Sequence, residues 1–164
     1  MKVIIDTNVP IVANGHKSSQ ASSSCKNNCI ATIRDVQHNH KLVLDQGWLV
    51  IREYLRHLNQ KGRPGVGDEF MLWVLQNHYN PAHCERVTIT PLPNSADGND
   101  FVEFPTDPTL TDFDRADRKF VAIALVHPEK PPILNATDTD WWNHLAILEK
   151  LGLQIRLLCP DAMP

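Results

Sequence analysis

The sequence predicts an α/β protein with a mostly parallel sheet that helices cover on both faces. Short apolar runs typical of buried strands alternate along the chain with longer segments of helical periodicity. Two of the apolar runs end at or near an aspartate, at Asp6 and at Asp138. Because ligands of parallel sheets bind beyond the carboxyl ends of the strands, both acids fall where a site is expected.

Three strands and three helices are predicted in the first half of the chain. The strands are expected at about 3–5, 41–44 and 86–90, and the helices at about 24–39, 46–60 and 67–79. A polar, serine-rich loop at about 16–24 leads into the first helix and ends in serines suited to cap it. The face that the second helix buries is predicted from an apolar stripe of Trp48, Ile51, Leu55 and Leu58.

The second half begins with a long irregular loop at 91–112 that contains four prolines. Loops of this length are typically functional or mobile. Beyond it we expect a helix at about 114–126, a strand at 133–134, a helix at about 141–151 closed by Gly152, and a strand at 154–159. The last helix starts with Trp141-Trp142, and because adjacent helix residues point about 100° apart, one of the two is expected to be exposed. We expect residues 1–164 to form a single domain.

The composition is that of a globular protein, with 42% hydrophobic and 21% charged residues. The formal net charge is −3, but removing six acids that we assign below to one cluster leaves an excess of three basic residues. A mildly basic surface around an acidic cluster is compatible with a phosphodiester substrate. The chain reaches Asp6 too early for a signal peptide and has no apolar run near the roughly 20 residues that span a bilayer. We therefore expect a cytoplasmic protein without a membrane segment.

The chain has four cysteines, Cys25, Cys29, Cys84 and Cys159. In a reducing compartment they are expected to be free thiols. The alternative is a zinc site, since Cys25 and Cys29 share a helix face and His38 and His40 follow, although this spacing matches no common zinc finger. Ordinary helix packing of the two cysteines is the favoured interpretation.

Three acidic segments indicate a metal site. They are Asp6-Thr7-Asn8 after one apolar strand, the pair Asp114 and Asp117 at a helix start, and Asp138-Thr139-Asp140 after another strand. A spacing of three puts both acids of the pair on one helix face. Clustered carboxylates repel each other unless a cation joins them, and Mg²⁺ or Mn²⁺ are the usual hard ions for oxygen ligands. Each segment alone is also explained by a turn, a helix cap or the helix dipole.

In these segments the chain resembles the PIN-domain nuclease family. Residues 4–9 (Ile-Ile-Asp-Thr-Asn-Val) resemble its opening motif, residues 114–122 its third acidic motif, and residues 133–140 its last strand-end motif. The segment from Leu44-Asp45 to Leu55 is similar to the one that carries the second acid, which places that acid at Glu53. The resemblance covers nearly the whole chain and implies a three-layer α/β/α sandwich with a central, mostly parallel sheet.

The resemblance also implies an endoribonuclease that uses Mg²⁺ or Mn²⁺ to hydrolyse single-stranded RNA. The residues that would hold the metal and act in catalysis are Asp6, Glu53, Asp117 and Asp138, with Asp114 and Asp140 as auxiliary acids. Asn8 would orient Asp6 or the substrate, and Arg118 and Lys119 would contact phosphates, although a solvated helix face is the favoured interpretation for these two. Toxin–antitoxin or RNA-processing roles, an antitoxin partner and a homodimer are further implications of the family.

The sequence departs from the family pattern at two places. Ala136 stands where many members carry a serine or threonine, and Glu53 lies nearly opposite the apolar stripe of its helix, so a solvated side chain is the alternative for Glu53 and Asp45 is then the substitute. The alternatives to an RNA-cutting enzyme are a PIN-like module that binds RNA or a protein without cutting, and a DNA-directed nuclease. Phosphatase chemistry with Asp6 as nucleophile is disfavoured because Asn8 replaces the second aspartate that it needs.

Overall fold

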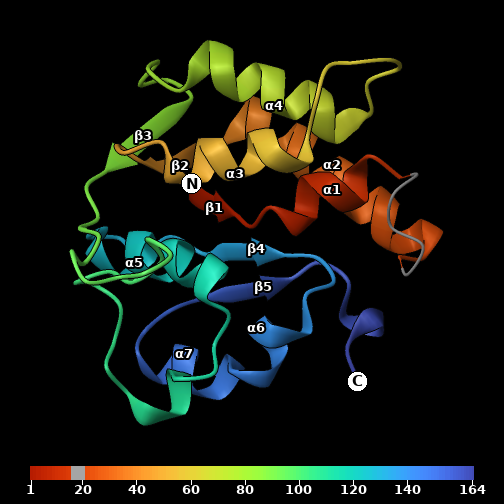
Figure 1. The fold of residues 1–164 in the computed structure, drawn as a ribbon. Coiled ribbons are helices and arrows are strands. Elements are labelled where there is room, and N and C mark those ends of the chain that lie inside the picture. The colour runs from red at the N-terminus through yellow and green to blue at the C-terminus, as the bar shows by residue number, and fades with distance from the viewer. Residues whose placement is uncertain (16–20) are drawn as a thin grey trace.

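A five-stranded, fully parallel sheet forms the centre of the computed structural model, which describes residues 1–15 and 21–164 (Figure 1). The strands are β1 (Lys2–Ile5), β2 (Lys41–Asp45), β3 (Cys84–Val87), β4 (Ile133–Asn135) and β5 (Ile155–Leu157). Their order across the sheet is β3-β2-β1-β4-β5. Residues 16–20 of the predicted serine-rich loop lie outside the described residues.

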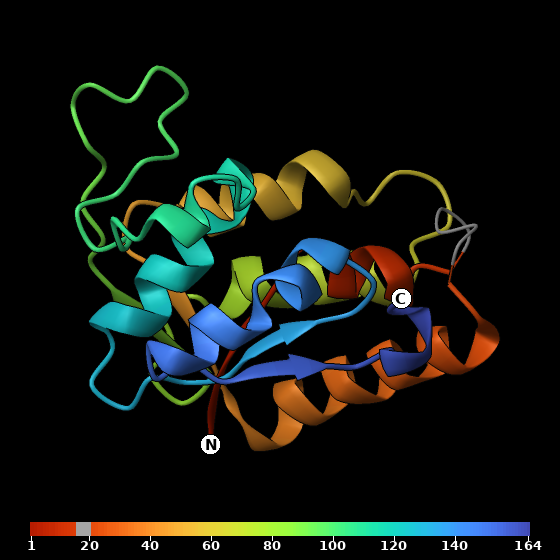
Figure 2. The same ribbon diagram turned by 90° about the horizontal axis from the view of Figure 1, so that it is seen from below.

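Helices cover both faces of this sheet, which confirms the expected three-layer α/β/α sandwich. The helices are α1 (Asn8–Ala13), α2 (Ser23–Asn39), α3 (Leu49–His57), α4 (Val66–Asn77), α5 (Arg118–Val126), α6 (Thr139–Asn143) and α7 (Leu145–Lys150), with short 3-10 turns η1 (Pro108–Leu110), η2 (Arg115–Asp117) and η3 (Pro160–Ala162). In Figure 2, α2 lies along one face while α5 and α7 lie on the other. None of the helices in the described part of the chain is both long and apolar enough to cross a membrane.

The short helix α1, which directly follows Asp6, was not among the predicted elements. Its six residues are mostly apolar, and Pro10 is tolerated in its first turn because the N–H groups there need no helical partner. The helix packs closely on α4, where Gly67 allows the approach. A Cβ atom at Gly67 would lie 1.9 Å from the backbone oxygen of Pro10, so the contact requires glycine.

The predicted buried face of α3 is wrong at two positions. Leu55 is 44% exposed, whereas Glu53, which the apolar stripe places on nearly the opposite side of the helix, is only 8% exposed. The helix begins at Leu49 because the carboxylate of Asp45 accepts hydrogen bonds from the backbone N–H groups of Leu49 and Val50, both at 2.9 Å. This cap fixes the rotation of the helix about its axis, and it assigns Asp45 to capping rather than to the acidic cluster.

Other elements also differ from their predicted bounds, such as the helix expected at about 114–126, which is divided into η2 and α5. The strand expected at 86–90 is β3, two residues earlier, because it pairs with β2 in register up to Asp45 opposite Val87. The helix expected at 141–151 is divided into α6 and α7 at His144. The ring Nδ1 of His144 lies 2.9 Å from the carbonyl oxygen of Asp140, within hydrogen-bonding distance at the break.

The expectation of four free thiols is wrong for Cys25 and Cys159, which form a disulfide. After β5 the chain returns to the first turn of α2 and brings the two Cα atoms to 5.1 Å, across a sequence separation of 134. A disulfide is unusual in the reducing compartment that we expected. Cys29 and Cys84 are free and buried. The zinc alternative with His38 and His40 is also wrong, since these histidines lie at the other end of α2, roughly 13 Å or more beyond Cys29.

Candidate metal centre

Three carboxylates from distant parts of the chain converge at the carboxyl edge of the sheet. Asp6 follows β1 and Asp138 follows the neighbouring parallel strand β4, while Asp117 ends the 3-10 turn that leads into α5. Each offers one oxygen atom, and the three oxygens lie within 4.8 Å of one another. The structure therefore brings together three of the six acids that the sequence assigned to one cluster.

Asp6 is buried and held by two neighbouring side chains. Its Oδ1 accepts hydrogen bonds from the backbone N–H and from Nδ2 of Asn8, both at 2.9 Å. Its Oδ2 accepts a hydrogen bond of 2.5 Å from the indole Nε1 of Trp141. These bonds fix the orientation of the carboxylate, as predicted for Asn8, whereas the part of Trp141 was missed.

Asn8 also links Asp6 to the segment that carries Asp138. Its Nδ2 donates to Oδ1 of Asn135 at 2.6 Å, and its Oδ1 accepts from the backbone N–H of Ala136 at 2.7 Å. Asn135 in turn donates from Nδ2 to the carbonyl oxygen of Asp138 at 3.0 Å. The ends of β1 and β4 are thus joined by side-chain amides, which set the separation of the two aspartates.

Asp117 is the least compensated member of the cluster. It is 6% exposed, and its Oδ2 is a buried atom without a hydrogen-bond partner among the described residues. Burial raises the pKa of Asp117, and the nearby charges of Asp6 and Asp138 raise it further. Burial also raises the pKa of Asp6, opposed in part by the N–H of Asn8. A divalent cation among the three oxygens would relieve both the repulsion and the missing partner.

Glu53, the expected second acid, is engaged by the protein itself. Lys119 forms a buried ion pair with one carboxylate oxygen, and the hydroxyl of Thr7 donates to the other at 2.5 Å. Lys119 is 4% exposed and also donates to the backbone oxygen of Ala116, so the favoured interpretation of a solvated helix face is wrong for this residue. Glu53 is close enough to Asp6 for its charge to affect it. After burial, the charge of Glu53 is one of the smaller causes that raise the pKa of Asp6.

Asp114 and Asp140 lie at the rim of the cluster. Asp114 is exposed and caps η2, accepting from the backbone N–H of Ala116 at 2.9 Å. Asp140 accepts from the backbone N–H of Asp114 at 2.8 Å. Asp117 lies in the cluster while Asp114 stays at the helix start, because Asp114 is the N-cap of η2 with an extended ψ of 123° and the two acids do not share a regular α-helical face.

Arg118 faces the long loop at 91–112 and not the acidic cluster. Its guanidinium lies over the ring of Phe104, with 4.7 Å from Cζ to the ring centroid, and pairs with Asp100 at 3.1 Å. Arg115 pairs with the same Asp100 at 2.6 Å and with Asp97 at 2.7 Å. Two arginines thus attach the loop to the start of α5, and the loop aspartates Asp97 and Asp100 balance their charges.

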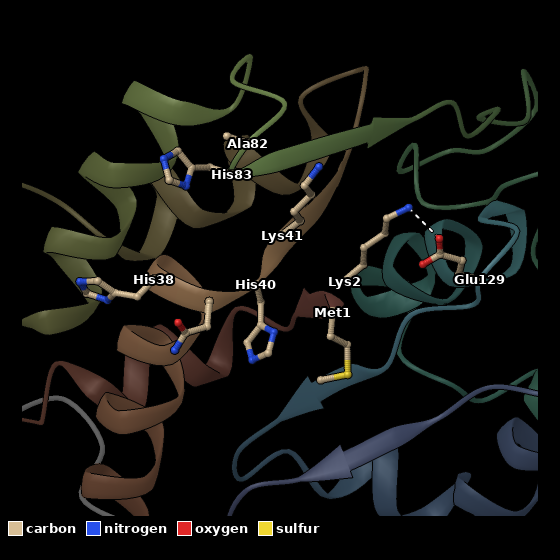
Figure 3. Close-up of a pocket in the computed structure, with 9 residues that line it drawn as sticks. Met1, Lys2, His38, His40, Lys41, Ala82, His83 and Glu129 are labelled. Atoms are coloured by element: carbon tan, nitrogen blue, oxygen red, sulfur yellow. Dashed lines mark hydrogen bonds and ion pairs between the residues drawn. The ribbon is translucent and has the colours of Figure 1, made fainter.

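A cavity of about 390 Å³ lies at the opposite edge of the sheet, where β1 and β2 begin (Figure 3). Basic residues predominate in its lining, namely Lys2, Lys41, His38, His40 and His83. Lys2 reaches out to Glu129 at 2.9 Å, and the histidines point in different directions. In the described part of the chain they do not form a group of three potential metal ligands, so this cavity is not an alternative metal centre.

Sequence reasoning missed Trp141, Thr7 and Asn135, all of which hold acids of the site in place. Thr7 lies within the first predicted acidic segment and Asn135 precedes the last one, but nothing in the sequence indicates which acid each would contact. The arrangement as a whole is a set of hard oxygen donors, two of them buried and that of Asp138 partly buried, and it is suited to a divalent cation. Comparison of the chain with family models, with curated proteins and with solved structures finds no match in any of the three.

Proposed function

We propose that this protein is a divalent-metal-dependent endoribonuclease with its centre at Asp6, Asp117 and Asp138. The observation that carries the proposal is the convergence of the three carboxylates within 4.8 Å, although they come from residues far apart in the sequence. Buried like charges at this separation are costly without a cation. The fold also offers this position for a ligand, at the carboxyl ends of two adjacent parallel strands.

The donor set fits Mg²⁺ or Mn²⁺. All three ligands are hard carboxylate oxygens, and the buried Oδ2 of Asp117 has no partner within the described residues. When bound, such an ion lowers the pKa of water and stabilises negative charge on phosphate and leaving-group oxygens. Asn8 and Trp141 keep the carboxylate of Asp6 in one orientation, which lowers the cost of organising the site.

Glu53 and Lys119 act in this proposal as positioning residues. The ion pair places the ammonium of Lys119 next to the acidic cluster and gives the buried carboxylate of Glu53 a partner from the protein. The hydroxyl of Thr7, directly after Asp6, is held by the same carboxylate. Metal ligation by Glu53 would require exchange of Lys119 for the metal, so we assign the ligands to the other three acids. Asp114 and Asp140 remain auxiliary acids at the rim, and Arg118 has no phosphate role while it is paired with the loop.

Our proposals for the substrate and the partners rest on the resemblance to PIN domains. Single-stranded RNA, a toxin role with an antitoxin partner, a homodimer and a cytoplasmic location are all features of that family, and we propose them on this basis. Trp141 is buried and Trp142 is 39% exposed, so Trp142 offers apolar surface to a partner or a second copy. Light scattering of wild type and Trp142→Ala tests the homodimer directly.

The nuclease proposal is tested with an end-labelled single-stranded RNA and a DNA of the same sequence. Wild-type protein should cleave the RNA in the presence of Mn²⁺, and the cleavage should stop when EDTA is added. Asp6→Asn should lower the rate at least about 100-fold. Glu69→Gln, at an exposed acid on α4 outside the cluster, should leave the rate unchanged and shows that loss of an acid elsewhere does not reduce cleavage, while Asp6→Asn purified in the same way controls for contaminating nucleases. Equal cleavage by wild type and Asp6→Asn would contradict the assignment of the metal centre. Cleavage of the DNA but not of the RNA would mean that the substrate is DNA rather than RNA.

A second candidate is a PIN-like module that binds RNA or a protein without cutting. It is favoured by the Lys119–Glu53 ion pair, which removes one expected acid from the cluster. Calorimetric titration with millimolar Mn²⁺ separates the two candidates. Absence of metal binding, together with RNA binding that leaves the RNA intact, would support the module.

A further inference from the structure

A second group of potential metal ligands lies at the start of α2. Cys25 is in the first turn of this helix, Cys29 is one turn further, and Cys159 follows β5. The three sulphur atoms lie within 4.8 Å of one another, and all three residues are buried. Two of them form the disulfide, and Cys29 is a free thiol beside it.

We propose that, in the reduced protein, Cys25, Cys29 and Cys159 form a thiolate site for a soft metal ion of the zinc class. Formation of the site requires two balanced steps. A dithiol reductant transfers two electrons and two protons to the disulfide, becomes a disulfide itself and leaves two protein thiols. The metal ion then replaces the protons of the three thiols, which are released to solvent.

The distances suit a single ion. Sulphur atoms around zinc lie roughly 2.3 Å from the metal and therefore about 3.8 Å from each other in a tetrahedral site. The sulphur of Cys29 is already within 4.8 Å of the other two. Opening the disulfide lets Cys25 and Cys159 separate to this spacing by side-chain rotation, since their Cα atoms are 5.1 Å apart. The C-terminal segment keeps an independent anchor, because Asn28 Nδ2 donates to the backbone oxygen of Leu158 at 3.1 Å.

A route to the sulphurs and a fourth ligand are also present. A cavity of about 130 Å³ is lined by both disulfide cysteines and by polar residues, which are Ser22, Ser24, Asn28 and Asp161. It has room for a water molecule, and the carboxylate of Asp161 is a further oxygen donor. A fourth, exchangeable position is therefore open beside Cys25 and Cys159.

Cys84 provides the comparison for this site. It is buried and free like Cys29, but it is not part of any group of three potential ligands in the described residues. A disulfide alone would need only Cys25 and Cys159. The third sulphur at Cys29 is therefore the feature that distinguishes a metal site from a structural crosslink, and the test is built on it.

The test is a Cd²⁺ titration of anaerobically reduced protein, followed by the ultraviolet charge-transfer absorption of cadmium–thiolate bonds. This absorption reports only on sulphur, so metal binding at the carboxylates does not affect it, and the result does not depend on the proposed nuclease function. Reduced wild type should bind one equivalent, and Zn²⁺ should displace it. Oxidised wild type should give no absorption.

Two variants complete the experiment. Cys29→Ser keeps the disulfide when oxidised and should lose at least about 100-fold in Cd²⁺ affinity when reduced. Cys84→Ser should bind as wild type does. Circular dichroism follows folding in each sample, and a reduced chain that unfolds without metal but refolds with Cd²⁺ supports the site as well. Equal affinity of Cys29→Ser and wild type would overturn the proposal, as would a reduced wild type that shows no charge-transfer absorption, folded or unfolded.

Discussion

Replacement of Asp117 by asparagine should stabilise the metal-free protein at neutral pH and abolish its stabilisation by Mn²⁺. Asparagine keeps the shape of the side chain but has no charge. In the wild type the carboxylate of Asp117 lies within 4.8 Å of Asp6 and Asp138, and its Oδ2 has no compensating partner in the described residues. An amide removes the repulsion and can donate a hydrogen bond to either neighbouring carboxylate.

The magnitude follows from the separation of the charges. Two unit charges 4.8 Å apart repel by roughly 3 kcal/mol at an effective dielectric constant of about 20. The metal-free protein avoids this by holding a proton, since burial and the charges of Asp6 and Asp138 raise the pKa of Asp117 to about 10. An unfolded aspartate ionises near pH ~3.9, so holding the proton at pH 7.5 costs at most about 5 kcal/mol. We expect Asp117→Asn to raise the free energy of unfolding by about 3 kcal/mol at this pH.

The same linkage sets the sign of the pH dependence. A carboxyl whose pKa is raised by folding contributes stability that is fully present below its unfolded pKa and is lost as the pH rises through its folded pKa. In EDTA the contribution of Asp117 to the stability of the wild type should therefore decline from about pH 4 upwards. The Asp117→Asn variant lacks this decline, because asparagine does not ionise. The difference of about 3 kcal/mol at pH 7.5 should fall below about 1 kcal/mol at pH 4.

Urea unfolding followed by tryptophan fluorescence measures both effects. In EDTA the two proteins are compared at pH 4 and pH 7.5, and at pH 7.5 the titration is repeated with Mn²⁺ at about 100 times its dissociation constant. Wild type should then gain about 2.7 kcal/mol and the variant less than about 0.5 kcal/mol. Asp114→Asn is the matched control from the same segment, because asparagine can still cap η2, and it should change stability by less than about 0.5 kcal/mol. A variant that is less stable than wild type in EDTA at pH 7.5, or that responds fully to Mn²⁺, would refute the reasoning.

Three further predictions concern contacts around the site and in the fold. Trp141→Phe removes the donor to Asp6 and should lower the free energy of unfolding by about 1–3 kcal/mol and weaken Mn²⁺ binding about 10-fold by calorimetry; unchanged affinity would contradict its orienting role. Lys119→Met leaves Glu53 buried without its cation and should cost about 3–5 kcal/mol in urea unfolding, most of it recovered when Glu53→Gln is added. Gly67→Ala forces a Cβ against the backbone of α1 and should cost more than about 2 kcal/mol, measured by thermal melting; a neutral effect would mean that the helices can separate.

Much of the sheet could be predicted because buried parallel strands are apolar on both faces. Val3, Ile4 and Ile5 are all nearly inaccessible, so their continuous apolar pattern indicates a strand without knowledge of its neighbours. Helix α1 could not be predicted in the same way, since six mostly apolar residues have no helical period that distinguishes them from more strand. The disulfide could not be predicted from the sequence either. It depends on where the chain returns after β5, and its two cysteines are 134 residues apart in the sequence.

The site divides along the same line. Asp6 and Asp138 were predictable because the carboxyl ends of neighbouring parallel strands meet at one edge, whatever the loops do. The environment of Glu53 depends instead on the rotation of α3, which the cap from Asp45 sets through two backbone hydrogen bonds. A stripe of apolar residues in the sequence does not contain that information, and it placed Glu53 on the wrong side.

The Lys119–Glu53 pair then determines how the site behaves without metal. Glu53 is buried, and its carboxylate is paired with a side chain of the protein, Lys119, rather than with a bound ion. Its position should therefore not depend on the metal. Asp117 has no such partner among the described residues, so its only alternatives are a cation or a proton. Removal of metal should accordingly alter the protonation of Asp117, because in the described part of the chain Asp117 lacks a protein group that balances its charge. Glu53, Lys119 and Thr7 should stay in place.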